Sequence, residues 1–372
     1  SDLSMFIEKI DKEMLLKPLQ TVIGIVERKQ PLPILSNVLI EKTNSSLRFT
    51  ATDLEIQITT QIEESGQKGE SIAITVGAKK LQEILRVVPD GSKVSLDVQD
   101  SRIQVKVNKS RFSLQTLPAQ DFPKVSEQLS QAETVQIEQR QLKALISMVQ
   151  YAMAQQDIRY YLNGVLLVVD GTTLKLIATD GHRLAFTCCG LENKHPKREV
   201  ILPRKTVNEL VKLLADTEEK VTLTLADNQV KIAFGEVELT TKIIDGKFPD
   251  YERVVPNYTN HLTMDRLGIL QALQRAAILS NEKFRGVRFV LTEKNLRIIS
   301  NNSEQEEAQE DIETDYHGVA LDIGFNVNYL LDGLNSVTSE TVTFSFGDPN
   351  SSILITVPDN ENFKYVVMPM RI

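Results

Sequence analysis

Apolar and polar residues alternate over short stretches of this chain, while a few longer stretches repeat apolar residues every three to four positions. The helical spacing is clearest over residues 138–153, where Leu142, Leu145 and Val149 share one face. The same spacing predicts helices over residues 11–26, 77–88, 203–215, 265–280 and 326–337. Pro18 predicts a kink in the first helix or a shorter helix.

Strict alternation predicts the strands, which lie between the helices. They cover residues 5–9, 34–41, 93–98, 102–107, 162–169, 221–225, 230–234, 287–291, 296–300, 341–346 and 353–357. Antiparallel strands interrupted by isolated helices indicate an α+β fold with helices on one face of the sheets.

One pattern occurs three times. Residues 174–185, LKLIATDGHRLA, predict a strand, a tight Asp-Gly turn and a second short strand. Imperfect copies are LRFTATDLEIQI at 47–58 and LRIISNNSEQEE at 296–307. Ala51, Ala178 and Ser300 align with offsets of 127 and 122 residues, which is one domain length. The repeat therefore predicts three domains, over residues 1–130, 131–257 and 258–372.

The composition is that of a soluble globular protein, with 41% hydrophobic and 25% charged residues in 372. No apolar run approaches about 18 residues and no secretory leader opens the chain, so we expect a cytoplasmic protein without a membrane span. Cys188 and Cys189 are adjacent and cannot easily reach disulfide geometry. We expect both to be reduced thiols.

The formal net charge of -8 argues against a protein that coats nucleic acid with its whole surface, but it allows one basic face. Basic residues do occur on the outward edges of the predicted helices. They are Lys12, Lys17, Lys79, Lys80, Arg86, Arg140, Lys143, Arg204, Lys205, Lys212 and Arg275. From spacing alone they form either a phosphate-facing surface or an ordinary solvated face. The helix over 326–337 departs from this pattern, since it has no basic residue and carries Asp332.

Opposite charges also stand at the two ends of the chain. Residues 304–315, EQEEAQEDIETD, hold seven acids and no base, whereas the first domain offers Lys79, Lys80, Lys109 and Arg111. Such patches suit a head-to-tail contact between two copies. The alternative is an acidic surface loop.

An enzyme is one rival interpretation, because Asp180 and His182 lie close to Cys188 and Cys189. Against it, the chain has no nucleophile elbow, no P-loop and no paired metal-ligand motif, and we predict no cofactor or metal site. We expect Asp180 to hold the turn and His182 to be partly buried. A second rival is a monomeric peptide-binding scaffold that does not encircle DNA.

Several segments carry a family resemblance. They are LLKPLQ and LPILSN in the first domain, QDIRYYLNG and ATDGHRLA in the second, AAILSNEKFRGVR in the third, and the terminal YVVMPMR. The chain resembles the bacterial DNA polymerase III beta subunit, the replicative sliding clamp. The resemblance implies three tandem clamp domains, each with two helices and antiparallel sheets. It also implies a head-to-tail homodimer, a six-domain ring around duplex DNA that is not catalytic and confers processivity on polymerases.

The resemblance further implies a cleft for short extended peptides. Its residues here would be Arg159, Leu162, Thr179, Gly181, His182, Arg183, Leu184, Pro249, Arg253, Val254, Asn326, Tyr329, Ser352, Val366, Val367, Met368, Pro369, Met370 and Arg371. Leu, Val, Pro and Met offer an adaptable apolar surface for Leu or Phe anchors. From sequence alone, a terminal apolar VVMPM is more often a final core strand. Ile372 stands where the family often has leucine.

The ring has two further implied surfaces. The residues facing DNA would be Lys29, Lys79, Lys80, Gln156, Tyr160, Tyr161, Arg204 and Lys205. The dimer interface would contain Lys80, Lys109, Arg111, Phe112, Leu114, Ile278, Leu279, Glu304, Glu306, Glu307 and Glu310. The implied partners are a second copy of the chain, double-stranded DNA, the DNA polymerase III alpha subunit, the delta subunit of an ATP-using clamp loader, other DNA polymerases, ligase and mismatch-repair proteins. No membrane partner is implied.

Overall fold

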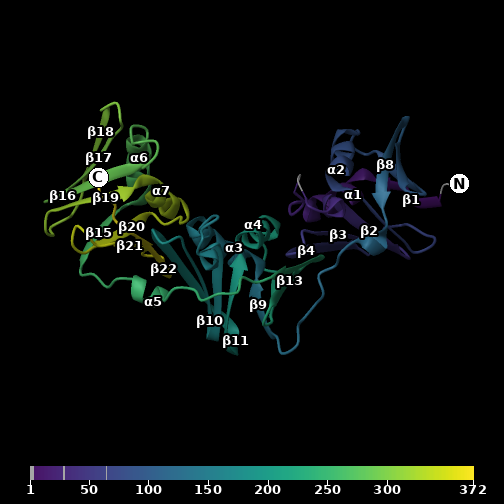
Figure 1. Cartoon of the computed structure of the whole chain (residues 1–372). Helices are drawn as coiled ribbons and strands as arrows, with labels where there is room; N and C mark the ends of the chain where they lie inside the picture. Colours follow the sequence, from purple (N-terminus) through teal and green to yellow (C-terminus); the bar gives the residue numbers. More distant parts are fainter. Residues whose placement is uncertain (1–3, 28–29, 64) are drawn as a thin grey trace. The chain divides into compact units, whose positions relative to one another are not determined.

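The computed structural model describes residues 4–27, 30–63 and 65–372. The chain forms two compact units, one from Ser1–Arg140 and Lys212–Ile243, the other from Gln141–Val211 and Ile244–Ile372. Each unit combines helices with antiparallel sheet, and the elements keep the labels of Figure 1. The α+β prediction is confirmed.

The first unit is built on one twelve-stranded sheet with the order β1-β6-β7-β8-β5-β2-β3-β4-β14-β13-β12-β9. Its elements are β1 Ser4–Asp11, α1 Lys12–Ile23, β2 Asn37–Thr43, β3 Ser46–Thr52, β4 Ile56–Ile62, β5 Ile72–Gly77, α2 Ala78–Val87, β6 Lys93–Gln99, β7 Arg102–Val107, β8 Ser110–Leu117, β9 Glu133–Glu138, β12 Lys220–Leu225, β13 Gln229–Phe234 and β14 Val237–Lys242. Helix α1 packs against α2 and against β3 and β4, so its apolar stripe closes one face of the sheet.

The second unit holds a six-stranded sheet, β10-β11-β22-β21-β20-β15, and a four-stranded sheet, β18-β17-β16-β19. Its elements are most of α3 Gln139–Val149, then β10 Gly164–Thr179, β11 Arg183–Pro203, most of α4 Arg204–Leu213, α5 Tyr251–Val254, β15 Asn260–Asp265, α6 Arg266–Ala277, β16 Gly286–Thr292, β17 Asn295–Asn301, β18 Glu307–Glu313, β19 Leu321–Asn326, α7 Val327–Asn335, β20 Thr341–Phe346, β21 Ile353–Val357 and β22 Asn360–Val367. Helix α6 packs against α7 and against strands of both sheets.

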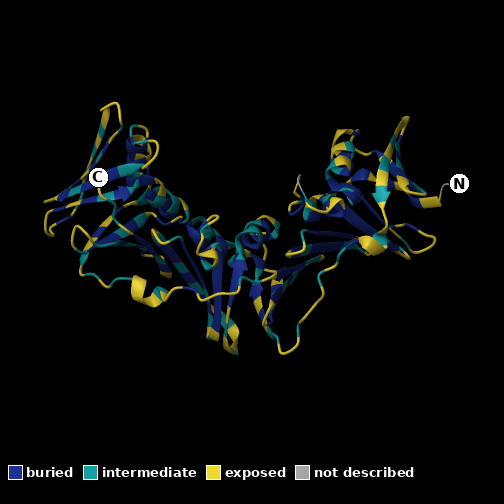
Figure 2. Cartoon of the chain, viewed as in Figure 1, coloured by how far each residue is buried: buried dark blue, intermediate teal, exposed yellow. Residues whose placement is uncertain are grey.

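Burial follows the alternation of the sequence. In β16, Val287, Phe289 and Leu291 are buried while the residues between them are not. Figure 2 shows the same change from buried to exposed along many strands. The pattern arises because successive strand side chains point to opposite faces of a sheet.

The threefold repeat is confirmed by the strand pairing. Ala51, Ala178 and Ser300 are all buried, and each lies on a strand that pairs with the next strand along the chain. A side-chain oxygen caps the turn in every copy. Asp53 Oδ1 accepts from the N–H groups of Glu55 and Ile56, Asp180 Oδ1 from those of His182 and Arg183, and Asn302 Oδ1 from those of Glu304 and Glu306. The expectation that Asp180 holds its turn is therefore also confirmed.

Some element boundaries were predicted wrongly. Helix α1 runs through Pro18 and ends at Ile23, because Pro18 is buried in the packed face, where tertiary contacts stabilise the turn that lacks one hydrogen bond. Residues Pro33–Ser36 form a short 3₁₀ turn, so the next strand begins at Asn37. Strand β10 is continuous where two strands were expected, since Gly171 takes a φ of 60° and the register shifts there without ending the strand.

Two side chains were also placed wrongly. Lys12, expected on the outward edge of its helix, is buried, and its Nζ donates to the Val88 carbonyl oxygen at 2.8 Å and lies 3.1 Å from Asp90 Oδ1. His182, expected to be partly buried, is exposed at its turn. The chemical character of each side chain alone did not determine whether it would be buried.

Candidate functional site

A cavity of about 350 Å³ lies within the second unit, beside the turn that joins β10 to β11. Its lining residues are Arg159, Tyr161, Leu162, Thr179, Gly181, Arg183, Leu184, Pro249, Val254, Val366 and Met368. Leu162, Leu184 and Val366 also belong to the buried cluster beneath it, so the floor is continuous with the core. The walls are mainly apolar, which suits an apolar side chain of a ligand.

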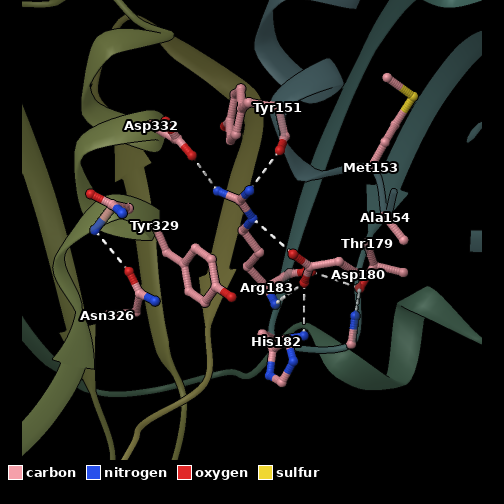
Figure 3. A network of polar contacts seen from close by, with 12 residues as sticks. Tyr151, Met153, Ala154, Thr179, Asp180, His182, Arg183, Asn326, Tyr329 and Asp332 are labelled. Atoms are coloured by element: carbon pink, nitrogen blue, oxygen red, sulfur yellow. Dashed lines mark hydrogen bonds and ion pairs between the residues drawn. The ribbon is translucent and has the colours of Figure 1, made fainter. Parts of the chain in front are cut away.

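Arg183 is the polar centre of this region (Figure 3). Its Nη1 donates to Asp332 Oδ2 at 2.6 Å, its Nη2 to the Tyr151 carbonyl oxygen at 2.7 Å, and its Nε to Asp180 Oδ2 at 3.3 Å. Only 9% of the Arg183 side chain is exposed. One cation therefore joins the β10–β11 turn to α7 and to the 3₁₀ turn after α3.

Two tyrosines complete the surroundings of Arg183. The guanidinium lies 4.4 Å from the centre of the Tyr329 ring, and the Tyr365 hydroxyl donates to the Tyr329 carbonyl oxygen at 2.8 Å. Burial opposes the charge on Arg183, but Tyr365 and Asp332 outweigh burial and raise the pKa of the guanidinium. Burial also raises the pKa of the Tyr365 hydroxyl. The arginine thus stays charged while the tyrosine stays neutral.

Arg159 forms one rim of the cavity. Its Nη2 lies 3.0 Å from Asp157 Oδ2, and hydrogen bonds from Arg159 lower the pKa of the Asp157 carboxyl. Gly181 has a φ of +90°, and a Cβ built there would stand 3.1 Å from the Arg159 guanidinium. Only glycine fits this close approach without strain.

The other residues assigned to the cleft lie around the cavity rather than in its lining. Asn326 caps α7 by accepting from the Asn328 N–H, and the His182 and Tyr329 rings lie 6.1 Å apart. Ser352 accepts from the Tyr258 hydroxyl, Val367 is buried in β22, and Arg253 pairs with Asp250 on an exposed helix. Met370 and Arg371 line a second hollow of about 340 Å³, and Pro369 connects them to Met368.

Tyr161 lines the cavity, although the resemblance placed it among the residues that face DNA. Its ring lies 5.8 Å from that of Tyr160, which is exposed. In the sequence, Tyr161 lies between Arg159 and Leu162, both of which were assigned to the cleft. This position could have indicated that Tyr161 lines the cavity as well.

The residues assigned to DNA have varied surroundings. Lys79 and Lys80 line a hollow of about 690 Å³ in the first unit, together with Arg102 and Leu114. Gln156 is exposed with a φ of 53°, and Lys205 is half-buried. Arg204 Nη1 donates to the carbonyl oxygens of Met153 and Ala154. Lys29 lies outside the described residues.

The residues assigned to the dimer interface gather on two strand edges. Among the described residues, β8 pairs with β7 along most of its length but with β5 only through Thr116 and Leu117, and β18 pairs only with β17. Phe112 and Leu114 are half-buried on β8, near exposed Lys109 and Arg111. Glu304, Glu306 and Glu307 are exposed before or at the start of β18, and Glu310 is half-buried within it. Ile278 is exposed directly after α6, and Leu279 is half-buried.

The residues that suggested an enzyme have structural roles in the fold. Asp180 is engaged in its turn, and burial raises the pKa of the Cys188 and Cys189 thiols. Among the residues described, no three or more His, Cys, Asp or Glu side chains are placed to hold a metal ion. None of the helices in the described part of the chain has both the length and the apolar composition to cross a bilayer.

Three family models match the chain in succession. They are those of the DNA polymerase III beta subunit, namely its N-terminal domain at residues 5–126, its central domain at 136–250 and its C-terminal domain at 252–371. The chain belongs to the DNA polymerase III beta subunit family. It therefore consists of three tandem clamp domains, and its function is that of a DNA sliding clamp.

Relatives of this family are similar over nearly the whole chain. The beta sliding clamp of Pseudomonas putida is 47% identical over 369 residues, covering 98% of this chain and 99% of the relative. That of Escherichia coli K12 is 42% identical over 364 residues, with the same coverage. A crystal structure of the Pseudomonas aeruginosa sliding clamp bound to griselimycin has a TM-score of 0.93 at 44% identity, covering 99% of this chain and 100% of that one. These similarities do not favour the monomeric scaffold.

Proposed function

We propose that two copies of this chain close head to tail as a six-domain ring, which encircles duplex DNA without reading its sequence. The ring tethers replicative polymerase and other replication and repair proteins through the cavity beside Arg183, and it is not itself catalytic. Family membership along the whole chain carries this proposal. The proposed domains are residues 1–130, 131–257 and 258–372, and the three successive family matches support them.

The two unpaired strand edges support the dimer. An open edge presents unpaired N–H and C=O groups to another strand. Arg111 lies on β8 and Lys109 in the turn before it, whereas the acids before and within β18 have the opposite charge. Surface ion pairs contribute about 0 to 1 kcal/mol each, so the apolar residues Phe112, Leu114 and Ile278 should carry most of the affinity.

The dimer is tested with matched exposed side chains. Ile278 is 76% exposed and Val319 is 75% exposed, both in the second unit. Ile278→Asp should convert the dimer to a monomer in light scattering after gel filtration, whereas Val319→Asp should leave it dimeric. A dimeric Ile278→Asp protein would contradict this interface.

Encirclement is tested by topology. A ring that slides must contact phosphates loosely, since tight or base-specific contacts would hold it in place. The protein, loaded by a clamp loader onto a nicked circle, should be retained for much longer than on the same DNA after linearisation. Equal retention on both would rule out encirclement.

The tether is tested with a short peptide that carries Leu and Phe anchors. Met368 lines the cavity and is partly exposed, so Met368→Asp should abolish binding measured by fluorescence anisotropy. Val87→Asp, at an exposed position of α2 in the first unit, is the control and should bind normally. The proposed partners are the polymerase III alpha subunit, the clamp-loader delta subunit, other polymerases, ligase and mismatch-repair proteins, all in the cytoplasm.

A further inference from the structure

We propose that Asp332 is a positioning residue of the peptide cleft, which acts by holding Arg183 in place without touching the peptide. The inference rests on the proposed peptide-binding function and adds a residue to it. Asp332 lies on α7, and it is absent from both the lining of the cavity and the residues assigned to the cleft.

The position of Asp332 explains an anomaly of the sequence. Helix α7 carries no basic residue, unlike the other predicted helices, whose basic residues were candidates for phosphate contact. The Asp332 carboxylate of this helix instead points toward the β10–β11 turn. There, Asp332 Oδ2 accepts a hydrogen bond from Arg183 Nη1 at 2.6 Å (Figure 3). Asp332 is 41% exposed, whereas its arginine partner is 9% exposed. The acid therefore stabilises a cation that water hardly reaches.

Each guanidinium nitrogen of Arg183 already donates a hydrogen bond inside the protein. Nε is bound by Asp180, Nη1 by Asp332 and by the Tyr365 hydroxyl at 3.4 Å, and Nη2 by the Tyr151 carbonyl oxygen. A guanidinium has five N–H donors in a fixed planar arrangement. Arg183 thus lines the cavity as part of a rigid wall, whereas Arg159 and Arg253 remain at the exposed rim.

The same wall orients two further parts of the cleft. Tyr329 stacks on the Arg183 guanidinium, and Met368 is held by a hydrogen bond from its N–H to the His182 carbonyl oxygen at 2.9 Å. Loss of the Asp332 charge removes the negative partner at the shortest contact of a buried cation, so the arginine and the turn next to it relax. The apolar walls then no longer match an extended peptide.

Asp332→Asn tests this with little change in shape. The control is Asp322→Asn, because Asp322 lies 2.5 Å from Arg288 on the same domain, is 52% exposed, and lines neither hollow. A peptide with Leu and Phe anchors should bind Asp332→Asn about 3- to 30-fold more weakly, the range typical of residues coupled to a site without contacting it. Binding to Asp322→Asn should match wild type. Equal affinity of Asp332→Asn and wild type would overturn the proposal.

A double-mutant cycle separates positioning from a general loss of stability. If Asp332 acts through Arg183, then Asp332→Asn should cause no further loss of affinity in an Arg183→Lys background. A further loss of the same size as in wild type would overturn the proposal, and melting temperatures of all variants identify any that misfold. Failure of the wild-type protein to bind the peptide would instead contradict the proposed function.

Discussion

Arg275 and Glu310 form an ion pair within one chain. Arg275 Nη2 lies 2.6 Å from Glu310 Oε1, and Nε donates to the same oxygen at 2.9 Å, which links α6 to β18. From the sequence, Arg275 was one of the basic helix residues that face either phosphates or solvent, and Glu310 was assigned to the dimer interface. The hydrogen bonds that Arg275 donates to Glu310 raise the pKa of the guanidinium, so each charge already has a partner.

We expect Arg275→Ala to leave the salt dependence of DNA binding nearly unchanged. Each phosphate neutralised by a protein cation contributes about 0.9 to the slope of log K against log salt. Lys17, which is exposed on α1, is the comparison, and Lys17→Ala should lower the slope by about that amount if it faces DNA. Binding to short duplexes at several salt concentrations gives both slopes. If the slope of log K against log salt fell by about 0.9 in Arg275→Ala, the ion pair between Arg275 and Glu310 would have to open on DNA.

We expect Leu54→Gly to stabilise the first unit. Leu54 has a φ of 80° at the repeat position where Gly181 has a φ of 90°, and it is 38% exposed. A left-handed conformation of a residue with a side chain costs on the order of 1 kcal/mol, and glycine removes that cost. The free energy of unfolding in urea should therefore rise by about 0.5 to 1 kcal/mol.

Leu117→Gly is the control for this substitution. Leu117 is also 38% exposed, but its φ is not positive, so glycine there should destabilise the strand. A decrease in both variants would mean that the packing of Leu54 outweighs its backbone strain.

We expect Gly246→Ala to weaken peptide binding by about threefold or more, through contact with Tyr161. A Cβ at Gly246 would stand 3.1 Å from Tyr161 Cβ and 3.3 Å from Tyr160 Cε2, so the tyrosines must shift. Gly190→Ala is the control, because only one atom lies as near as 4.0 Å to its added Cβ. Calorimetric titration with the peptide gives the two affinities, and unchanged binding by Gly246→Ala would show that Tyr161 can move freely.

We expect the two cysteines to alkylate slowly in the native protein. Burial, with a smaller contribution from Cys188, raises the pKa of the Cys189 thiol from 9.0 to about 11, so little thiolate is present at pH 8. Because the folded pKa lies above the unfolded one, this thiol contributes stability below pH 9 that is lost as the pH rises toward 11. Iodoacetamide labelling followed by mass spectrometry, with and without denaturant, measures the difference. Rapid native labelling of Cys189 would contradict its burial.

Much of the local structure was predictable from the sequence. The helices α2, α3, α4, α6 and α7 lie close to their predicted ranges, because an apolar stripe at helical spacing must be buried. Strand β10 was not predicted as one strand, since the bulge at Gly171 depends on its pairing with β11. Most residues assigned to the cleft by resemblance lie in or around one cavity, but Tyr161 was assigned elsewhere.

The threefold repeat was determined by the sequence itself, because the same local pattern recurs one domain length apart. The amphipathic faces and the capped turn at Asp180 were also determined by the sequence, because each depends on residues within a few positions of one another. Tertiary structure alone decided where the charges act. Lys12 is buried and paired with Asp90, Arg275 is paired with Glu310, and Asp332 is paired with Arg183. The partners in these pairs are 78, 35 and 149 positions apart in the sequence, and no spacing rule relates residues that only folding brings within hydrogen-bond distance.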